Sequence, residues 1–351
     1  MCYTRPMASL APAAIVGASA ISAFGVGWRG LGRALRDGAL APAVSSQLSA
    51  SHPGTLSSEV AAIPAQADVG DQKSRRLMSR SAHLAAVAMR AALEEASWSE
   101  GRDMIGCFLG LGASGGPMEE LGAMLKASVR DGRIDPARFC REGLAAAHPL
   151  LAFHLLGNFT LCHGSIAAGV GGPNRAFYSR GAGTVTALSE AMWSLAEGDC
   201  DRALAGGADS GLHLATFVEL HLEGFIGKGL VPGEGAAWLA LAKSADKPLA
   251  TLEACVVGRD AARVWEQLGG ADLAVIAPWG PPARKELESV KADVRVDLFL
   301  GLGDPLAAGV ALGCAAALDL LVAREAASAI VLCAGVDGEI GGVKLCAGGA
   351  L

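Results

Sequence analysis

Residues 172–209 read GPNRAFYSRGAGTVTALSEAMWSLAEGDCDRALAGGAD, and this stretch determines the predicted fold. From Ala187 onward the apolar residues recur at helical spacing, which predicts a helix. That helix is expected to stop at Gly198, because glycine readily adopts the left-handed conformation that ends helices. A strand ending at Gly206–Gly207 should follow. A helix followed directly by such a strand is typical of α/β proteins.

Strands and helices alternate along the rest of the chain as well. The first part contains strand-like runs at 13–17, 105–112 and 236–242 and a strongly amphipathic helix at 78–96. A second, shorter β/α series follows, with helices expected around 260–268 and 305–323 and final strands near 328–333 and 342–346. We therefore expect two successive halves, residues 1–250 and a shortened half at 251–351, around a mostly buried sheet.

The segment at 172–209 resembles the nucleophile region of the β-ketoacyl synthases of fatty-acid and polyketide assembly. In that family a Gly-Pro-Asn turn leads into a short strand, and the nucleophilic cysteine stands seven residues after the asparagine. GASGGPMEEL at 112–121 is similar to the glycine-rich strand-to-helix turn of the family, and VPGEGAAWLAL at 231–241 is similar to its Gly-Glu-Gly-Ala strand. The resemblance covers nearly the whole chain. It implies a thiolase-like layered α/β/α/β/α fold.

The same alignment shows that the catalytic residues of the family are missing. The nucleophile position holds Gly181, which has no side chain to attack a thioester. The two family histidines have no counterpart, because no histidine follows His221. Their motifs align with Trp279 and with Gly303, or with Asp304 if the register moves by one residue, and none of these is an imidazole donor to an oxyanion. The resemblance therefore implies that this pocket has lost its chemistry.

A ketosynthase relative without these residues is most simply explained as a partner subunit. Family members dimerise by pairing the strand after Gly-Pro-Asn, here 175–179, across a two-fold axis, and the helix-like segment 150–160 would lie at that interface. In iterative polyketide systems, chain-length-factor subunits use this contact to hold an active ketosynthase and to shape the tunnel of the growing chain. We therefore expect a heterodimer with an active ketosynthase. The interface or tunnel candidates are His154, Phe159, His163, Arg175, Phe177, Tyr178 and, near the gate position of the family, Ile340.

An acyl carrier protein is a further partner that the resemblance implies. The basic cluster KSRR at 73–76 is a candidate contact for it. The simpler interpretation of this cluster is a solvated entry to the helix that follows.

A serine hydrolase remains an alternative from another class. GASGG at 112–116 fits the G-x-S-x-G nucleophile elbow, with Ser114 after a predicted strand and before a predicted helix. Asp209 followed by His213 or His221 gives the chain order of a catalytic triad. Against this hypothesis, 130 residues follow His221, whereas hydrolases usually place their histidine late in the chain.

A homodimeric acyl-binding protein or acyltransferase, repurposed within the thiolase fold, is the third hypothesis. It would use Cys162 or His163 near the old site, although a buried structural cysteine is the simpler explanation for Cys162. GLGASG at 110–115 also fits G-x-G-x-x-G, but no acidic residue follows at the ribose-binding distance. Nucleotide binding is therefore not expected.

Composition argues against several other classes. The chain has 351 residues, of which 52% are hydrophobic and 18% charged, and its net charge of −6 lies in no long block, so we expect a globular protein without a nucleic-acid footprint. None of the nine cysteines forms a C-x-x-C pair or a zinc-like spacing, so neither a metal nor a cofactor is expected. The apolar run after Arg5 continues into the first predicted strand, and the run at 305–318 is too short for a bilayer. We expect a soluble cytoplasmic protein.

Overall fold

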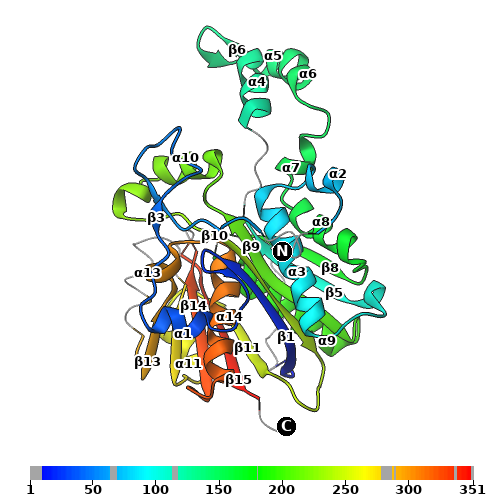
Figure 1. Cartoon of the computed structure of the whole chain (residues 1–351), viewed down its shortest axis with the longest axis vertical. Coiled ribbons are helices and arrows are strands. Elements are labelled where there is room, and N and C mark those ends of the chain that lie inside the picture. Colours follow the sequence, from blue (N-terminus) through cyan, green and yellow to red (C-terminus); the bar gives the residue numbers. More distant parts are fainter. Residues whose placement is uncertain are drawn as a thin grey trace.

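The computed structural model describes residues 10–63, 69–112, 118–179, 181–277, 287, 290–335 and 338–348. Within these ranges the chain forms a mixed sheet of 11 strands with helices on its faces (Figure 1). The strands are β1 (Ala13–Ser22), β2 (Gly25–Val26), β3 (Ala43–Val44), β4 (Leu56–Ser57), β5 (Gly106–Leu111), β6 (Val129–Arg130), β7 (Arg133–Ile134), β8 (Asn174–Tyr178), β9 (Arg202–Ser210), β10 (Glu234–Ala242), β11 (Ala250–Gly258), β12 (Leu273–Ile276), β13 (Val294–Asp297), β14 (Ser328–Ala334) and β15 (Ile340–Ala347). The helices are α1 (Leu31–Arg36), α2 (Gln72–Arg75), α3 (Arg80–Glu95), α4 (Met118–Ser128), α5 (Pro136–Arg138), α6 (Leu144–Ala146), α7 (Ala152–Leu155), α8 (Phe159–Ala168), α9 (Gly183–Glu197), α10 (Leu214–Leu222), α11 (Ala261–Gln267), α13 (Leu298–Leu302) and α14 (Ala308–Val322), with a π-helical turn η3 (Phe139–Gly143).

The strands are arranged in two halves that repeat one order. Across the sheet they follow β13-β12-β14-β15-β11-β1-β10-β9-β5-β8, with β2 beside β1. The two halves meet at the antiparallel pair β1 and β11. From there the first half follows the order β1-β10-β9-β5-β8, and the second half follows β11-β15-β14-β12-β13. If the main strands of each half are numbered along the chain, both halves show the same order, which is first, fifth, fourth, second, third. The outer pairs are parallel and the inner pairs antiparallel. The division expected near residue 250 coincides with the start of β11 and stays a prediction.

The helices form three layers around the two half-sheets. Helices α3 and α8 pack together, and α3 contacts β1, β9 and β10 of the first half, while α11 contacts β11 and β15 of the second half. Helices α9 and α14 lie between the halves, since each contacts strands from both. This is the layered α/β/α/β/α arrangement of the thiolase-like fold.

Helix α14 is enclosed by both halves and is apolar except at Asp319, whose buried carboxylate accepts hydrogen bonds from Gly30 and Arg33. Every residue from Ala308 to Leu321 is buried, as expected for a helix without a polar face in the centre of a protein. None of the helices in the described ranges is long and apolar enough to span a bilayer.

Most predicted elements are confirmed, and their ends follow local signals. Helix α3 begins after Ser79, whose hydroxyl accepts a hydrogen bond from the Ala82 amide at 3.2 Å. Helix α9 ends at Gly198, which has a φ of 81° as predicted. The strand expected to end at Gly206–Gly207 is longer, because β9 stays paired with β10 up to Ser210.

One other expectation needed correction. The helix-like segment 150–160 is broken, because α7 ends at Leu155 and α8 starts only at Phe159. Between α1 and α2, the chain also forms the short antiparallel pair β3–β4.

Residues 118–147, here called the arm, project from the body of the molecule (Figure 1). The arm consists of α4, the β6–β7 hairpin, α5, η3 and α6. Its helices contact one another, and none of them makes a comparable contact with another described element. The arm is therefore a self-packed unit outside the layered core.

Candidate functional site

Gly181, the position aligned with a ketosynthase nucleophile, lies in the short connection between β8 and α9. It is buried, and its amide donates a hydrogen bond to the Ser179 carbonyl at 3.0 Å. A β-carbon at Gly181 would lie 2.9 Å from the Ala334 carbonyl oxygen and 2.8 Å from the Gly335 Cα, closer than real β-carbons approach other atoms. The connection after β14 therefore fills the space that a nucleophilic side chain would need.

Thr184 joins the beginnings of the two central helices. Its hydroxyl donates a hydrogen bond to the Ala307 carbonyl, directly before α14, at 2.7 Å. Gly110 on β5 and Gly207 on β9 make this contact sterically feasible, because a β-carbon on either would overlap Thr184. The N-terminal ends of α9 and α14 therefore meet beside the ends of β5 and β9, next to Gly181.

Gly303 and Asp304, the residues aligned with the second family histidine, form the turn before α14. Gly303 has a φ of 63°, and a β-carbon there would lie 2.5 Å from the Val231 carbonyl oxygen. Asp304 is 2% exposed, and its carboxylate accepts a hydrogen bond from the Leu306 amide at 3.0 Å. The Asp304 amide donates a hydrogen bond to the Val231 carbonyl at 2.7 Å, and the Asp304 carbonyl accepts one from the Gly233 amide at 2.9 Å. An ionised carboxylate accepts hydrogen bonds and cannot replace a donor imidazole.

Asp209 is a fully buried carboxylate at the end of β9. It accepts hydrogen bonds from the Ser210 amide at 2.8 Å and from the Ala307 amide at 3.1 Å. The second bond places negative charge at the N-terminal end of α14, where the helix dipole favours it. Gly112 lies against this carboxylate and has no room for a side chain. Asp209 thus has a structural role that the sequence did not indicate.

The remaining residues of the hydrolase hypothesis are only partly described. Ser114 lies outside the described residues, as does Trp279, which was aligned with the first family histidine. His213 is the N-cap residue of α10, and His221 lies in its last turn, with its ring centroid 6.5 Å from that of Phe217. A triad through Ser114 therefore stays a prediction.

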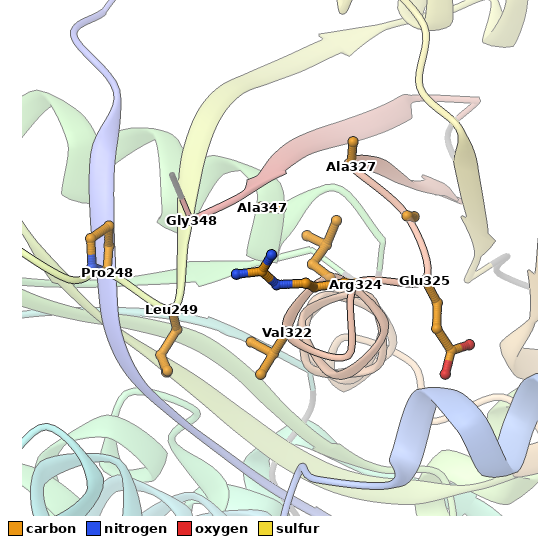
Figure 2. Close-up of a pocket in the computed structure, with 10 residues that line it drawn as sticks. Pro248, Leu249, Val322, Arg324, Glu325, Ala327, Ala347 and Gly348 are labelled. Atoms are coloured by element: carbon orange, nitrogen blue, oxygen red, sulfur yellow. The ribbon is translucent and has the colours of Figure 1, made fainter. Parts of the chain in front are cut away.

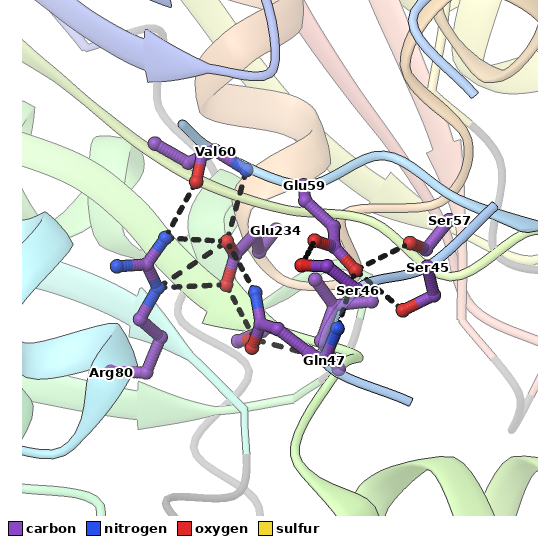
Figure 3. A network of polar contacts seen from close by, with 10 residues as sticks. Ser45, Ser46, Gln47, Ser57, Glu59, Val60, Arg80 and Glu234 are labelled. Atoms are coloured by element: carbon purple, nitrogen blue, oxygen red, sulfur yellow. Dashed lines mark hydrogen bonds and ion pairs between the residues drawn. The ribbon is translucent and has the colours of Figure 1, made fainter. Parts of the chain in front are cut away.

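Glu234, the acidic residue of the Gly-Glu-Gly-Ala strand, is the centre of a buried polar network (Figure 3). It is 2% exposed, and Arg80 approaches its carboxylate to 2.7 Å. Three further donors are the Ser210 hydroxyl at 2.9 Å, the Val60 amide at 3.0 Å and the Gln47 side chain at 3.3 Å. A charge can be buried at low cost only when it is paired and hydrogen-bonded in this way. The sequence signal was a lone glutamate within the apolar run 231–241.

Glu59 organises the loop beside that network. Its carboxylate accepts hydrogen bonds from the Ser45, Ser46 and Ser57 hydroxyls and from the Gln47 amide (Figure 3). Burial alone would raise the pKa of Glu59, but these hydrogen bonds outweigh burial and lower the pKa below its ordinary value. Together, Glu59 and Glu234 hold residues 45–60 against the start of β10, where the Gly233 amide donates a hydrogen bond to the Asp304 carbonyl.

Two of the predicted interface residues, Phe159 and His163 of α8, form an aromatic group with Phe153 of α7. The ring centroids of Phe153 and Phe159 lie 4.6 Å apart, and those of Phe159 and His163 lie 5.8 Å apart. Burial lowers the pKa of His163, with a smaller opposite effect from a hydrogen bond to the Leu77 backbone. The charge of the neighbouring His154 adds to the lowering. His163 is therefore mainly neutral near pH 7.

The predicted interface residues of β8 lie at the end of the sheet. Within the described chain β8 pairs with β5 alone, so its other edge is open. Arg175 is exposed and forms an ion pair with Glu190 of α9. Phe177 is half-buried against the central core, whereas Tyr178 is 65% exposed. These positions are compatible with an interface, and their roles remain predictions.

Ile340, the predicted gate residue, is buried in the second half. It is 1% exposed, pairs with Ala334 and Gly258, and belongs to the cluster that includes Val256. Its backbone thus belongs to the same β14–β15 pair whose connection covers Gly181.

The cysteines that the structure describes are free thiols. Burial raises the pKa of Cys107 and of Cys333 to about 12, so both are inert at neutral pH. Cys162, named in the third hypothesis, is half-buried on α8, whereas Cys140 is exposed on the arm. Among the described residues, no group of three His, Cys, Asp or Glu side chains could hold a metal ion.

A surface hollow of about 630 Å³ lies at the other end of α14 (Figure 2). Leu249, Val322 and Ala347 contribute to its walls, and the Arg324 side chain extends into it (Figure 2). The 15 residues of α14 separate this hollow from Ala307 by about 22 Å. It is therefore distinct from the ketosynthase position at Gly181.

The comparisons with known proteins agree with this geometry. A family model described as "Beta-ketoacyl synthase, N-terminal domain" matches residues 11–247. The chain belongs to the β-ketoacyl synthase family. No curated protein sequence matches it significantly.

Solved ketosynthase structures share the fold at low sequence identity. "The ishigamide ketosynthase/chain length factor" superposes with a TM-score of 0.72 at 21% identity, over 96% of this chain and 100% of that chain. A β-ketoacyl synthase from Burkholderia phymatum STM815 gives 0.73 at 17% identity, over 96% and 99%. The complex "AntDE:AntF (apo): type II PKS acyl-carrier protein in complex with its ketosynthase bound to the hexaketide" gives 0.72 at 14% identity, over 96% and 99%. This protein therefore has a ketosynthase-like fold along almost its whole length.

Proposed function

We propose that this protein is a non-catalytic ketosynthase-like subunit that pairs with an active β-ketoacyl synthase, as a chain length factor does. The observation that carries the proposal is the contact of Gly181 with Ala334 and Gly335. This position has no thiol, and the neighbouring backbone leaves no space for one. Without a nucleophile the growing acyl chain cannot be held covalently here.

The second part of the catalytic set gives independent support. No histidine follows His221 in the sequence, so the half of the chain that supplies both family histidines has none. Gly303 has no side chain, and Asp304 is buried as a hydrogen-bond acceptor. Neither residue stabilises an oxyanion as an imidazole does. The proposed role is therefore structural.

Pairing through β8 follows from its open edge. An unpaired edge strand is a template for pairing with another chain, and natural proteins usually cover or blunt such edges. Among the described residues no strand pairs with the outer edge of β8, and Tyr178 on it is 65% exposed. An antiparallel partner strand across a two-fold axis would cover both. The ketosynthase/chain length factor relative has the same fold, which makes a heterodimer the proposed assembly.

An acyl carrier protein is the proposed second partner, because one such relative is a ketosynthase complexed with its carrier. Lys73 and Arg76, exposed on and after the short helix α2, are the proposed contact. A carrier protein bound here would supply its acyl group to the heterodimer, because the partner ketosynthase carries out the condensation.

The direct test is reconstitution of condensation. An affinity-tagged chain is purified from its source organism, and a co-purifying ketosynthase is identified by mass and by its intact cysteine and two histidines. The two proteins are then mixed with acyl and malonyl carrier proteins, alone and together. We expect no carbon–carbon bond formation by this chain alone and a product of defined length from the pair. Condensation by the isolated chain, or a partner ketosynthase whose product is unchanged by it, would contradict the proposal.

A further inference from the structure

A second hollow, of about 330 Å³, lies beside the middle of β1. It is lined by residues 18–20 of β1, by residues 26–29 between β2 and α1, and by Ala91 and Glu95 of α3. None of these residues belongs to the site around Gly181. The volume is at the lower end of the range for small-molecule pockets.

Along this hollow one edge of β1 has no neighbouring strand. On that edge β2 pairs only with the end of β1 and β11 only with its beginning, so within the described ranges no strand pairs there with residues 16–20. The Ala20 carbonyl on this edge accepts a hydrogen bond from the Gly27 amide at 2.8 Å. The backbone groups of Ala18, two positions earlier, are directed to the same edge. An amide group of a ligand can bond to such an edge as a neighbouring strand would.

Two buried polar side chains that line the hollow have no hydrogen-bond partner among the described residues. Ser19 and Trp28 are each 3% exposed, and the orphaned atoms are the Ser19 Oγ and the Trp28 Nε1. By contrast, the buried indole of Trp238 donates to the Ala85 carbonyl at 2.9 Å. Buried polar atoms are normally hydrogen-bonded, and an indole can only donate. The two orphaned atoms therefore indicate a ligand that carries an acceptor oxygen.

The charges at the hollow favour a neutral ligand. Arg29 and Glu95 form an ion pair at 2.6 Å, so their charges offset each other, and the remaining lining residues are mainly small and apolar. The Arg29 guanidinium lies 4.4 Å from the centroid of the Trp28 ring, and its side chain is 58% exposed. A surface ion pair of this kind contributes little stability, so Arg29 can move aside to admit a ligand.

We propose that this hollow binds a small neutral amide. The carbonyl oxygen of the amide accepts a hydrogen bond from the Trp28 indole, and the Ser19 hydroxyl supplies a second hydrogen bond. The rest of the ligand lies along the unpaired edge of β1, with Arg29 as a movable cover. The site belongs to this chain alone, so it does not depend on the proposed pairing with a ketosynthase.

The indole of Trp28 reports directly on binding. The chain is isotope-labelled at its tryptophan indoles, and the Trp28 signal is identified by its loss in Trp28→Phe. N-methylacetamide is then titrated into the wild-type chain and followed by NMR. We expect the Trp28 indole proton to move downfield and to saturate with a dissociation constant of about 1–10 mM, as is reasonable for so small a molecule. The Trp265 signal, from α11 in the second half, should not move.

A substitution and a charged analogue test the chemistry of the site. Ser19→Ala should weaken N-methylacetamide binding by about fivefold or more, because one hydrogen bond is lost. The control is Ser194→Ala, a buried serine of α9 that contacts the Cys200 thiol at 3.4 Å, and it should bind normally. Acetate should bind at least about fivefold more weakly than the amide, because its charge must leave water.

Urea unfolding confirms that a loss of binding is not a loss of structure. Ser19→Ala removes a hydroxyl without a partner, so its unfolding midpoint should equal or exceed that of the wild type. A Trp28 shift that grows without saturation, or that the Trp265 signal shares, would be a solvent effect and would overturn the proposal. Equal affinity in Ser19→Ala and Ser194→Ala would also overturn it. Tighter binding of acetate than of the amide would show that the site selects an anion, and the assignment to a neutral amide would be wrong.

Discussion

A β-carbon on Gly181 would lie 2.9 Å from the carbonyl oxygen of Ala334, although the two residues belong to different halves of the fold. The segment after β14 thus covers the position where a ketosynthase carries its thiol. Because the obstructing atoms are backbone, a side chain at this position requires the chain itself to move.

Gly181→Ala should therefore destabilise the protein by about 1–3 kcal/mol, as overpacking of a buried position does. Gly122→Ala is the control, since no atom lies within 4 Å of a β-carbon built there in α4 and alanine is the better helix former. Urea unfolding of both variants gives the comparison. Gly181→Cys should be destabilised as well and remain inactive in condensation. A variant as stable as the wild type would show that the position is open.

Arg80 and Glu234 provide a second prediction, because their ion pair joins α3 to β10. Arg80→Met leaves a buried carboxylate without its cation and should cost about 3 kcal/mol of unfolding free energy. Arg29→Met is the control, since the Arg29–Glu95 pair is on the surface, with Arg29 58% exposed, and should cost no more than about 1 kcal/mol.

The double variant distinguishes the ion pair from simple loss of packing. Arg80→Met combined with Glu234→Gln should cost less than the sum of the two single changes, because no unpaired charge remains. Additive costs would mean that the charges of Arg80 and Glu234 do not interact appreciably.

The sequence predicted local features well and long-range contacts poorly. Helix α9 and its end at Gly198 follow from apolar spacing and one glycine, and α14 follows from a continuous apolar run. The break between α7 and α8 was missed, although Gly157 and Asn158 are residues typical of helix ends. Whether Gly181 has space for a side chain depends on residues from β14, which no local pattern reveals.

The polar network shows the same limit. Arg80 and Glu234 are 154 positions apart, so their pairing appears only once the sheet and α3 are assembled. A glutamate in an apolar strand indicated that a partner must exist, because a buried charge needs one. The identity of that partner could not be read from the sequence.

His163 predicts a pH dependence of partner binding. Burial already lowers its pKa below the ordinary 6.5, and a docked partner would bury the ring further. The complex then favours the neutral imidazole of His163, so protonation of this ring opposes association. The affinity for the partner is therefore highest above the pKa of His163 in the free chain, and it falls as the pH decreases through that pKa. Between about pH 7.5 and pH 5.5, we expect the dissociation constant to rise by up to about tenfold.

The control for His163 is His148, which is exposed before α7. His163→Gln should remove most of the pH dependence, whereas His148→Gln should retain it. Isothermal titration calorimetry with the partner ketosynthase at both pH values measures the difference. An equal pH dependence in the two variants would assign the titration to a group other than His163.

Tyr178 tests the strand pairing itself. Its side chain is 65% exposed at the end of β8, so Tyr178→Asp should leave the unfolding free energy of the isolated chain within about 0.5 kcal/mol of the wild type. In the heterodimer the same change would bury a carboxylate in an apolar contact, and we expect affinity to fall by about tenfold or more. Leu222→Asp on α10 introduces the same charge away from this edge and should bind normally. Equal binding by the two variants would place the interface elsewhere on the molecule. If a partner strand covered the Tyr178 position, a carboxylate there would lose its contact with water and weaken binding.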